Sequence, residues 1–235
     1  MAGQRRQVAL DGVTLSVMTW GDPAGPPVVL LHCLAGDADD WAVVGEALAA
    51  DGRWVVAPDM RGHGASGRTS GYSFDLMRDD VLALADALGL ERFDLVGHSM
   101  GGSVAILVAE AAPHRLGRLV LEDTAPATGK REFPVPPDEA PEEVPFDWPM
   151  LRALIAELND PDPRAWDDLP AITVPVLVVG GGPSSANDQD ELVELAARVP
   201  DGRVVTIDVG HHVHRAAPTE YLSKVRPFLT VPTSE

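Results

Sequence analysis

Short apolar runs alternate with segments of helical spacing along most of the chain, and this alternation is the strongest constraint on its fold. The runs lie at residues 27–31, 54–57, 93–96, 119–121, 176–179 and 204–207. The first two are short and continuous, which is typical of parallel strands buried on both faces. Segments with helical spacing separate or follow them at residues 41–50, 75–88, 102–112, 191–199 and 219–229. This order predicts an α/β fold with a mainly parallel sheet and right-handed crossovers.

The first segment of the chain has a different pattern. Polar and apolar residues alternate over residues 6–20, around an Asp11-Gly12 pair. Such alternation is typical of half-buried antiparallel strands, and Asp-Gly is a strong hairpin turn signal. We therefore expect the fold to open with an antiparallel hairpin.

One interval, residues 125–169, interrupts the alternation of strands and helices. It is rich in proline and acidic residues, and its helical pattern covers residues 148–158. We expect this interval to lie over the carboxyl edge of the sheet as a short cap. The remaining residues, 1–124 and 170–235, are then expected to form the core.

Composition narrows the class of protein and its partners. A chain of 235 residues with 45% hydrophobic residues can form one sizeable core, and no run approaches the roughly 20 apolar residues of a membrane span. The single cysteine, Cys33, cannot form an internal disulfide, and no secretory signal is recognisable after Met1, so a cytoplasmic location is expected. The formal net charge of −18 argues against nucleic acids and anionic membranes as partners.

The five residues Gly97-His98-Ser99-Met100-Gly101 lie between a predicted strand and a predicted helix. This context predicts a nucleophile elbow, a sharp turn that presents a serine at the end of a strand. Glycines two residues before and after the serine are required because a Cβ there would clash with neighbouring backbone. The N-terminus of the following helix directs N–H groups toward developing negative charge.

Four local signatures occur along the chain in a fixed order. They are His32-Cys33-Leu34-Ala35-Gly36, the segment from Asp59 to Ser66, the elbow around Ser99, and Gly210-His211. In this order the chain resembles the α/β-hydrolase superfamily along nearly its whole length. The resemblance implies a mostly parallel eight-stranded sheet with helices on both faces, a small-molecule substrate and no cofactor. The sequence also offers no convincing metal-ligand spacing.

The resemblance assigns roles to particular residues. Ser99 corresponds to the nucleophile, and His211, with Gly210 before it and Pro218 after it, corresponds to the general base. The backbone N–H groups of Leu34 and Met100 correspond to the oxyanion hole.

The acid of the triad is where the chain departs from the common pattern of the family. Ser184 stands at the usual acid position, and a serine cannot stabilise an imidazolium as a carboxylate does. Some members carry the acid after the sixth strand instead, and there the resemblance favours Asp123, with Glu122 as the alternate. Asp188 and Asp190 are further alternatives from the start of the next helix.

The expected reaction is cleavage of a carboxylic ester, lactone or related small acyl substrate through an acyl-enzyme. Carbon–carbon bond hydrolysis, acyl transfer and perhydrolysis use the same triad and remain alternatives, as does a non-catalytic ligand-binding relative. Trp41, Phe146 and Trp148 are expected to contribute to an apolar or aromatic substrate pocket, beside Leu34 and Met100.

Overall fold

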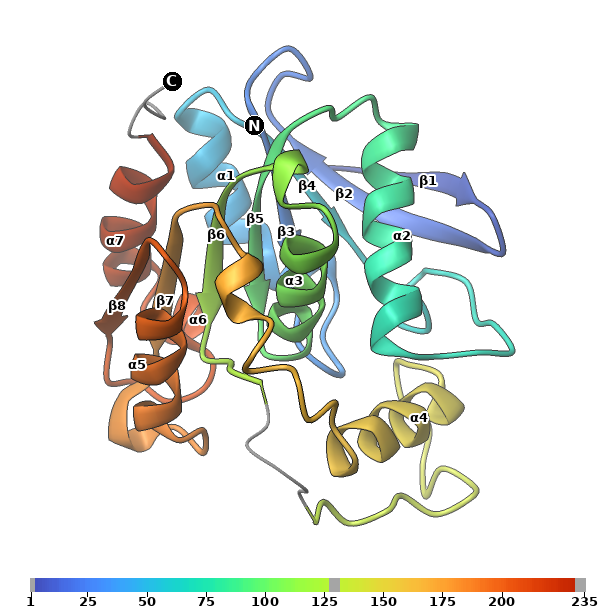
Figure 1. Cartoon of the computed structure of the whole chain (residues 1–235). Helices are drawn as coiled ribbons and strands as arrows, with labels where there is room; N and C mark the ends of the chain where they lie inside the picture. Colours follow the sequence, from blue (N-terminus) through green and yellow to red (C-terminus); the bar gives the residue numbers. More distant parts are fainter. Residues whose placement is uncertain (1–2, 127–131, 231–235) are drawn as a thin grey trace.

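Figure 1 shows the computed structural model, which describes residues 3–126 and 132–230. Its described part contains an eight-stranded sheet in the order β1-β2-β4-β3-β5-β6-β7-β8. The strands are β1 (Gln4–Leu10), β2 (Val13–Trp20), β3 (Pro27–Leu31), β4 (Trp54–Pro58), β5 (Phe93–His98), β6 (Leu116–Glu122), β7 (Val176–Gly180) and β8 (Gly202–Thr206). Each apolar run that predicted a strand coincides with one of them.

The sheet is mainly parallel, as predicted. Strands β3 to β8 pair in parallel, whereas β2 pairs antiparallel with both β1 and β4. The opening hairpin of β1 and β2 is confirmed, and Gly12 adopts a φ of 78° in its turn. Because β3 to β8 are parallel, their carboxyl ends lie along one edge of the sheet.

Except for the short helix at Val213–Ala216, which no segment predicted, the helices follow the predicted segments with small shifts at their ends. They are α1 (Ala42–Ala50), α2 (Phe74–Ala87), α3 (Met100–Ala111), α4 (Trp148–Asn159), α5 (Gln189–Arg198), α6 (Val213–Ala216) and α7 (Pro218–Thr230), with short 3-10 turns at Ala38–Trp41, Pro113–Arg115, Leu169–Ala171 and Gly182–Ser184. The main difference is at α3, which begins at Met100 rather than at residue 102. The elbow therefore passes directly from β5 into the helix.

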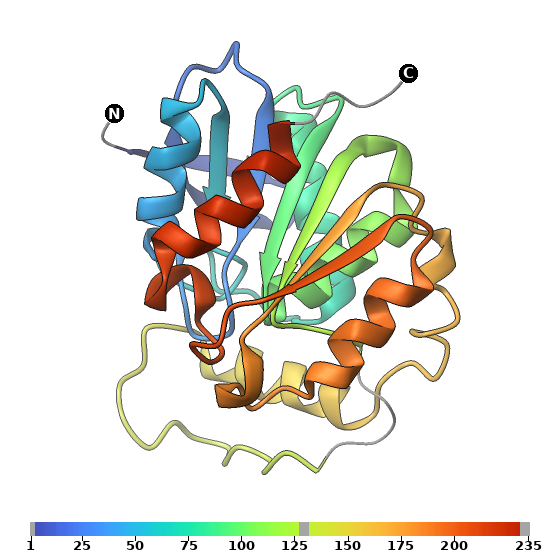
Figure 2. The same ribbon diagram turned by 90° about the vertical axis from the view of Figure 1, so that its left-hand side faces the viewer.

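Helices cover both faces of the sheet. On one face α1 and α7 lie side by side (Figure 2), and their buried residues Leu48 and Val225 share one hydrophobic cluster with strand residues. On the other face α2, α3 and α5 contribute Met77, Val104 and Leu195 to a second, larger cluster. This three-layer arrangement confirms the fold class expected from the sequence.

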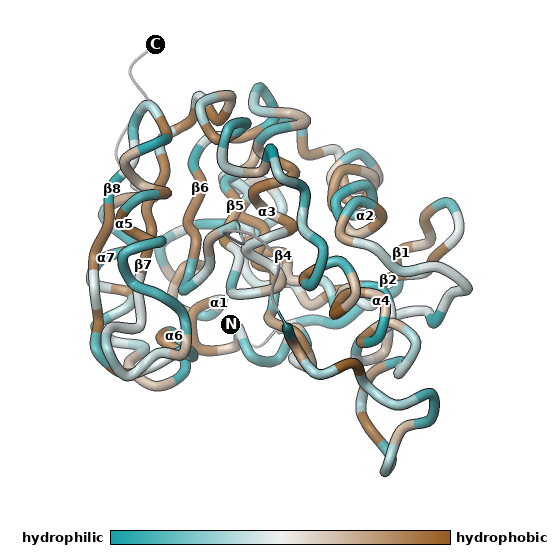
Figure 3. Tube along the Cα trace, turned by 60° about the horizontal axis from the view of Figure 1, so that its bottom comes forward, coloured by the Kyte–Doolittle hydropathy of each residue, from teal (hydrophilic) through white to brown (hydrophobic). Residues whose placement is uncertain are grey.

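Between β6 and β7 the chain crosses the carboxyl edge of the sheet, where α4 lies beyond the ends of the strands (Figure 1). Met150 and Leu154 of α4 are fully buried. Seen from this edge, the traces of β6 and β7 are largely hydrophobic, whereas the outer loops carry both hydrophilic and hydrophobic residues (Figure 3). Residues 127–131 of the expected cap and residues 231–235 of the expected core lie outside the described residues, and the boundaries of the cap stay a prediction.

None of the helices in residues 3–126 and 132–230 combines the length and the apolar character that a membrane span requires.

Arg53 connects four segments at the opposite, amino-terminal end of the sheet. Its guanidinium donates hydrogen bonds to the carbonyl oxygens of Pro26, Pro27 and Leu229 and to the carboxylate of Asp94, at 2.5 Å. The Arg53 and Asp94 side chains are 9% and 8% exposed. Removing one member of such a buried pair leaves the other charge without compensation.

We therefore expect Asp94→Ala to lower the free energy of unfolding by about 3 to 5 kcal/mol. The exposed pair between Glu194 and Arg198 on α5 is the matched control, and Glu194→Ala should cost less than about 1 kcal/mol. Urea denaturation monitored by circular dichroism measures both. Equal losses for the two variants would show that the Arg53 network does not stabilise this end of the sheet.

Candidate active site

Ser99 lies at the junction between β5 and α3. Its backbone has φ 53° and ψ −115°, in the left-handed half of conformational space that residues with a Cβ rarely occupy. Its N–H donates to the Glu122 carbonyl oxygen at 3.1 Å, and its own carbonyl accepts from Ser103 N–H at 3.0 Å. The turn is therefore strained locally and held from both sides, as a nucleophile elbow requires.

The two glycines of the elbow have no room for a side chain. A Cβ on Gly97 would overlap the carbonyl group of Gly101, and a Cβ on Gly101 would overlap the carbonyl group of Leu31. Both obstacles are backbone atoms that cannot rotate away. The sequence-based expectation that glycine is required on both sides of Ser99 is confirmed.

His211 lies in the loop between β8 and α6 and pairs with Asp123, which directly follows β6. The distance from His211 Nδ1 to Asp123 Oδ2 is 2.7 Å. The His211 side chain is 30% exposed, whereas Asp123 is fully buried. Because a carboxylate only accepts, Nδ1 carries the proton and Nε2 is left as the basic nitrogen.

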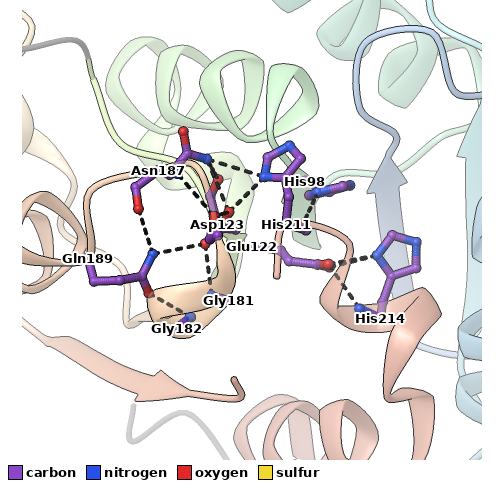
Figure 4. A network of polar contacts seen from close by, with 10 residues as sticks. His98, Glu122, Asp123, Gly181, Gly182, Asn187, Gln189, His211 and His214 are labelled. Carbon is purple, nitrogen blue, oxygen red and sulfur yellow. Dashed lines mark hydrogen bonds and ion pairs between the residues drawn. The ribbon is translucent and has the colours of Figure 1, made fainter. Parts of the chain in front are cut away.

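The Asp123 carboxylate accepts several further hydrogen bonds (Figure 4). The donors are Gly181 N–H at 2.8 Å, Ser185 Oγ at 2.5 Å, Asn187 Nδ2 at 3.1 Å and Gln189 Nε2 at 3.4 Å. Burial alone raises the pKa of a carboxyl group, but here the hydrogen bonds from His211, Ser185, Gly181 and Gln189 outweigh it and lower the pKa of Asp123 to about 2. Asp123 is therefore a carboxylate across the physiological pH range.

Three of these donors were missed by the sequence reasoning. Ser185, Asn187 and Gln189 follow β7, in the segment where the family commonly has its acid. The signal that could have revealed them is their position, since β6 and β7 are neighbours in the sheet and their carboxyl ends must meet.

Among the described residues, no hydrogen bond or ion pair joins the alternate acids to His211. Glu122 instead accepts from both the N–H and the Nδ1 of His214, at 2.9 and 2.8 Å, so its assignment as alternate acid is wrong. Asp188 caps α5 by accepting from Asp190 N–H at 2.9 Å. Of the carboxylates considered from the sequence, Asp123 is the one that the structure places on His211.

A cavity of about 250 Å³ opens beside Ser99 and His211. Leu34 and Met100, the residues expected to supply the oxyanion hole, both line it. Its other lining residues are mostly apolar and come from α2, α3, α4, α5 and the loops around them: Phe74, Ser103, Thr124, Ala125, Phe133, Leu154, Ile155, Leu158, Ala186, Asn187, Asp188, Glu191 and Leu192. The predicted nucleophile, base and oxyanion residues thus face one space.

Comparison with known proteins agrees with this geometry. Residues 26–165, more than half of the chain, match the model of the family described as the alpha/beta hydrolase fold. The chain belongs to this family.

Relatives in the α/β-hydrolase family include Esterase YbfF of Escherichia coli (strain K12), which is 27% identical over 239 residues, covering 86% of this chain and 92% of that protein. The acetyltransferase component of the acetoin cleaving system of Pseudomonas putida is 42% identical over 117 residues, covering 49% of this chain and 31% of that protein. The chain therefore matches less than a third of this second relative.

Among solved structures, a hydrolase from Pseudomonas aeruginosa PA01 superimposes with a TM-score of 0.85 at 26% identity, covering 98% of this chain and all of that one. The family match and the esterase relative support an α/β-hydrolase activity for the chain.

The aromatic residues expected in the substrate pocket of this α/β-hydrolase lie elsewhere. Trp41 is fully buried and stacks on His214, with ring centroids 4.0 Å apart. Phe146 packs beside His63, and Trp148 donates its Nε1–H to the carbonyl of Pro137. None of the three is among the described residues that line the cavity beside Ser99, where α4 contributes aliphatic residues instead.

Two groups of side chains among the described residues bring possible metal ligands within 4.8 Å of one another. One comprises Cys33, His98 and His212, and the other His98, Glu122 and His214. Burial raises the pKa of the Cys33 thiol to about 11, which disfavours the thiolate. In the second group Glu122 already bonds to His214 Nδ1, whereas His98 Nδ1 and His214 Nε2 have no hydrogen-bond partner among the described residues.

The crowding around Gly101 gives a test of the elbow geometry. We expect Gly101→Ala to lower the melting temperature and to abolish reactivity of Ser99, because the new Cβ would displace either α3 or the end of β3. Gly71→Ala is the control, since the nearest atom to a Cβ there is 3.6 Å away. Thermal unfolding and labelling by a fluorophosphonate measure the two effects. A Gly101→Ala protein as stable and reactive as Gly71→Ala would contradict the described turn.

The low pKa of Asp123 predicts a specific acid sensitivity. A carboxyl group whose pKa falls from 3.8 to about 2 on folding stabilises the folded state above pH 4, and this contribution disappears as the pH falls through 2. It corresponds to about 2 kcal/mol. In urea denaturation between pH 6 and pH 2, the stability advantage of wild type over Asp123→Asn should shrink over the acid end of this range. Parallel stability curves for the two proteins would contradict the assignment.

Proposed function

We propose that this chain is a serine hydrolase that cleaves a carboxylic ester, lactone or related small acyl substrate through an acyl-enzyme. The observation that carries the proposal is the convergence on one cavity of Ser99, of His211 with its partner Asp123, and of Leu34 and Met100. This set supplies a nucleophile, an oriented base and candidate donors for the oxyanion, which are the parts that acyl transfer needs.

In the first half of the reaction, Ser99 Oγ attacks the carbonyl carbon of the substrate and His211 Nε2 accepts the hydroxyl proton. Asp123 holds His211 through Nδ1 at 2.7 Å and stabilises the imidazolium that forms. His211 then gives the proton to the leaving alkoxide, and the acyl group remains on Ser99. In the second half, His211 activates water, which releases the acid and restores Ser99.

The carbonyl oxygen becomes negative in each half of the reaction, and the backbone N–H groups of Leu34 and Met100 are the proposed donors to it. Met100 is the first residue of α3, so its N–H has no acceptor within the helix. The positive end of the α3 dipole adds to the stabilisation. Removing one such donor typically costs about 3 to 4 kcal/mol of transition-state stabilisation.

The cavity favours a small substrate with an apolar acyl or alkyl group. Leu154, Ile155 and Leu158 of α4 and Phe74 of α2 contribute to its apolar wall. A volume of about 250 Å³ is at the lower limit of ordinary ligand pockets. Short to medium aliphatic esters therefore fit better than long or highly polar ones.

The test combines active-site labelling with a graded series of p-nitrophenyl esters. We expect a fluorophosphonate to label wild type and not Ser99→Ala. Asp123→Asn should lower kcat by roughly 10⁴-fold, because its amide supports the wrong His211 tautomer. Asp190→Asn is the matched control, since Asp190 lies in the first turn of α5 at an exposed position outside the cavity, and it should retain the rate of wild type. Folded wild type that resists labelling, or near-normal turnover by Asp123→Asn, would overturn the proposal.

A further inference from the structure

Glu122 contacts two of the segments that the proposed reaction uses. Its carbonyl oxygen accepts the N–H of Ser99 at 3.1 Å, and its side chain accepts two hydrogen bonds from His214. The next residue, Asp123, holds the His211 ring. Two consecutive residues at the end of β6 therefore touch the nucleophile and both ends of the segment from His211 to His214.

The contact between Glu122 and His214 is a second carboxylate–histidine pair beside the proposed triad. Glu122 Oε1 accepts the backbone N–H of His214 at 2.9 Å, and both carboxylate oxygens lie within 2.9 Å of His214 Nδ1. Burial opposes ionisation of Glu122, but the nearby rings of His98 and His214 and the hydrogen bonds from His214 lower its pKa. The cost of burying this carboxylate is offset because it accepts hydrogen bonds from both the backbone N–H and the ring of His214.

His98 holds the same loop from the side of β5. Its Nε2 lies 2.8 Å from the carbonyl oxygen of His211, and since a carbonyl only accepts, Nε2 carries the proton. Burial and the neighbouring histidines lower the pKa of His98 to about 4, so the ring is neutral at physiological pH. The segment from His211 to His214 is thus bound at its first residue by His98, through the His211 carbonyl, and at its last residue by Glu122, through the His214 N–H.

The pair is enclosed rather than exposed at the surface. Glu122 and His98 are fully buried and His214 is 2% exposed. Trp41 stacks on the His214 ring at an interplanar angle of 17°, and Tyr221 of α7 contacts the same ring edge-on. A buried pair supported by two aromatic rings has little freedom to move, which suits a part that fixes the position of another group.

We propose that Glu122 is a positioning residue for the triad, and that its carboxylate, acting through His214 and together with His98, fixes the loop that presents His211 to Ser99. The proposal rests on the serine hydrolase function proposed above. It assigns to Glu122 no contact with substrate and no proton transfer. Its consequence is that Glu122 affects the rate of the chemical steps through geometry, while substrate binding in the cavity is left largely intact.

The first test measures turnover per reactive serine. Glu122→Ala removes both acceptors for His214, and we expect kcat to fall by about 10²-fold, the cost of displacing a catalytic group by about 1 Å, with KM changed by less than about threefold. Glu122→Gln keeps an acceptor oxygen, and its kcat should be at least about tenfold higher than that of Glu122→Ala. His98→Phe, which removes only the donor to the His211 carbonyl, should also lower kcat with little change in KM.

The control is Asp94→Asn, which weakens a buried ion pair on β5 at the far end of the sheet. Counting reactive sites with a fluorophosphonate converts each activity into a rate per labelled serine. A purely structural effect of Glu122 would reduce the number of labelled sites and leave that rate unchanged, as expected for Asp94→Asn. A rate per site within about threefold of wild type in folded Glu122→Ala or in His98→Phe would overturn the proposal.

A second test needs no substrate, so that its failure is distinguishable from failure of the proposed function. The imidazole Nδ1–H signals of His211 and His214 are followed by proton NMR of ¹⁵N-histidine-labelled protein, in wild type, Glu122→Gln and His98→Phe. We expect the His211 Nδ1–H to exchange faster with solvent in both variants, because the loop is held less firmly. Unchanged His211 exchange in both variants would overturn the positioning role even if the enzyme hydrolyses esters. Faster exchange in a protein whose Ser99 is inert would support the loop attachment and refute the hydrolase.

Discussion

The register between β5 and β6 is the constraint on which the rest of the site depends. His98 pairs with Glu122 at the ends of these strands, and Ser99 donates its N–H back to Glu122. The nucleophile is therefore fixed relative to the strand whose next residue, Asp123, carries the acid. His211 comes from a distant loop, but Asp123 and His98 both bind it. The parallel sheet thus fixes where the backbone of Ser99 and Asp123 lies, and the side-chain hydrogen bonds from Asp123 and His98 fix the position of His211.

Two adjacent carboxylates are buried at this point, and the fold compensates each in a different way. Successive residues of a strand point to opposite sides, and the left-handed backbone of Asp123, with a φ of 46°, adds a turn at the end of β6. Asp123 is surrounded by donors from the loop after β7, whereas Glu122 has His214 from the start of α6. Burial of an unpaired carboxylate would cost several kcal/mol, and the hydrogen-bond donors around each of these two carboxylates offset that cost.

The sequence was sufficient for the sheet and the elbow, since each follows from a local pattern or from its order along the chain. For the partner of His211, the family resemblance favoured Asp123 but left Glu122, Asp188 and Asp190 open. It was not sufficient for side chains whose environment depends on packing between distant segments. Trp41 was expected in the substrate pocket because it is a large aromatic residue near the Leu34 loop; its ring instead packs on His214, more than 170 residues away in the chain. Likewise, the choice between Glu122 and Asp123 depends on which side of β6 each faces.

Gly181, which follows β7, explains how the acid of the triad can be the residue directly after β6. Asp123 N–H donates to the carbonyl of Val179, which places the Asp123 side chain directly beside Gly181. A Cβ on Gly181 would lie 3.1 Å from Asp123 Oδ1 and would overlap the Gly210 carbonyl, just before His211. A residue with a side chain at this position would therefore push apart the acid and the loop of the base. With glycine there, the backbone N–H of Gly181 becomes a donor to Asp123 at 2.8 Å, and its carbonyl accepts the N–H of Gly210 at 2.9 Å. The segment that commonly provides the acid thus serves here as the link between the acid and the base.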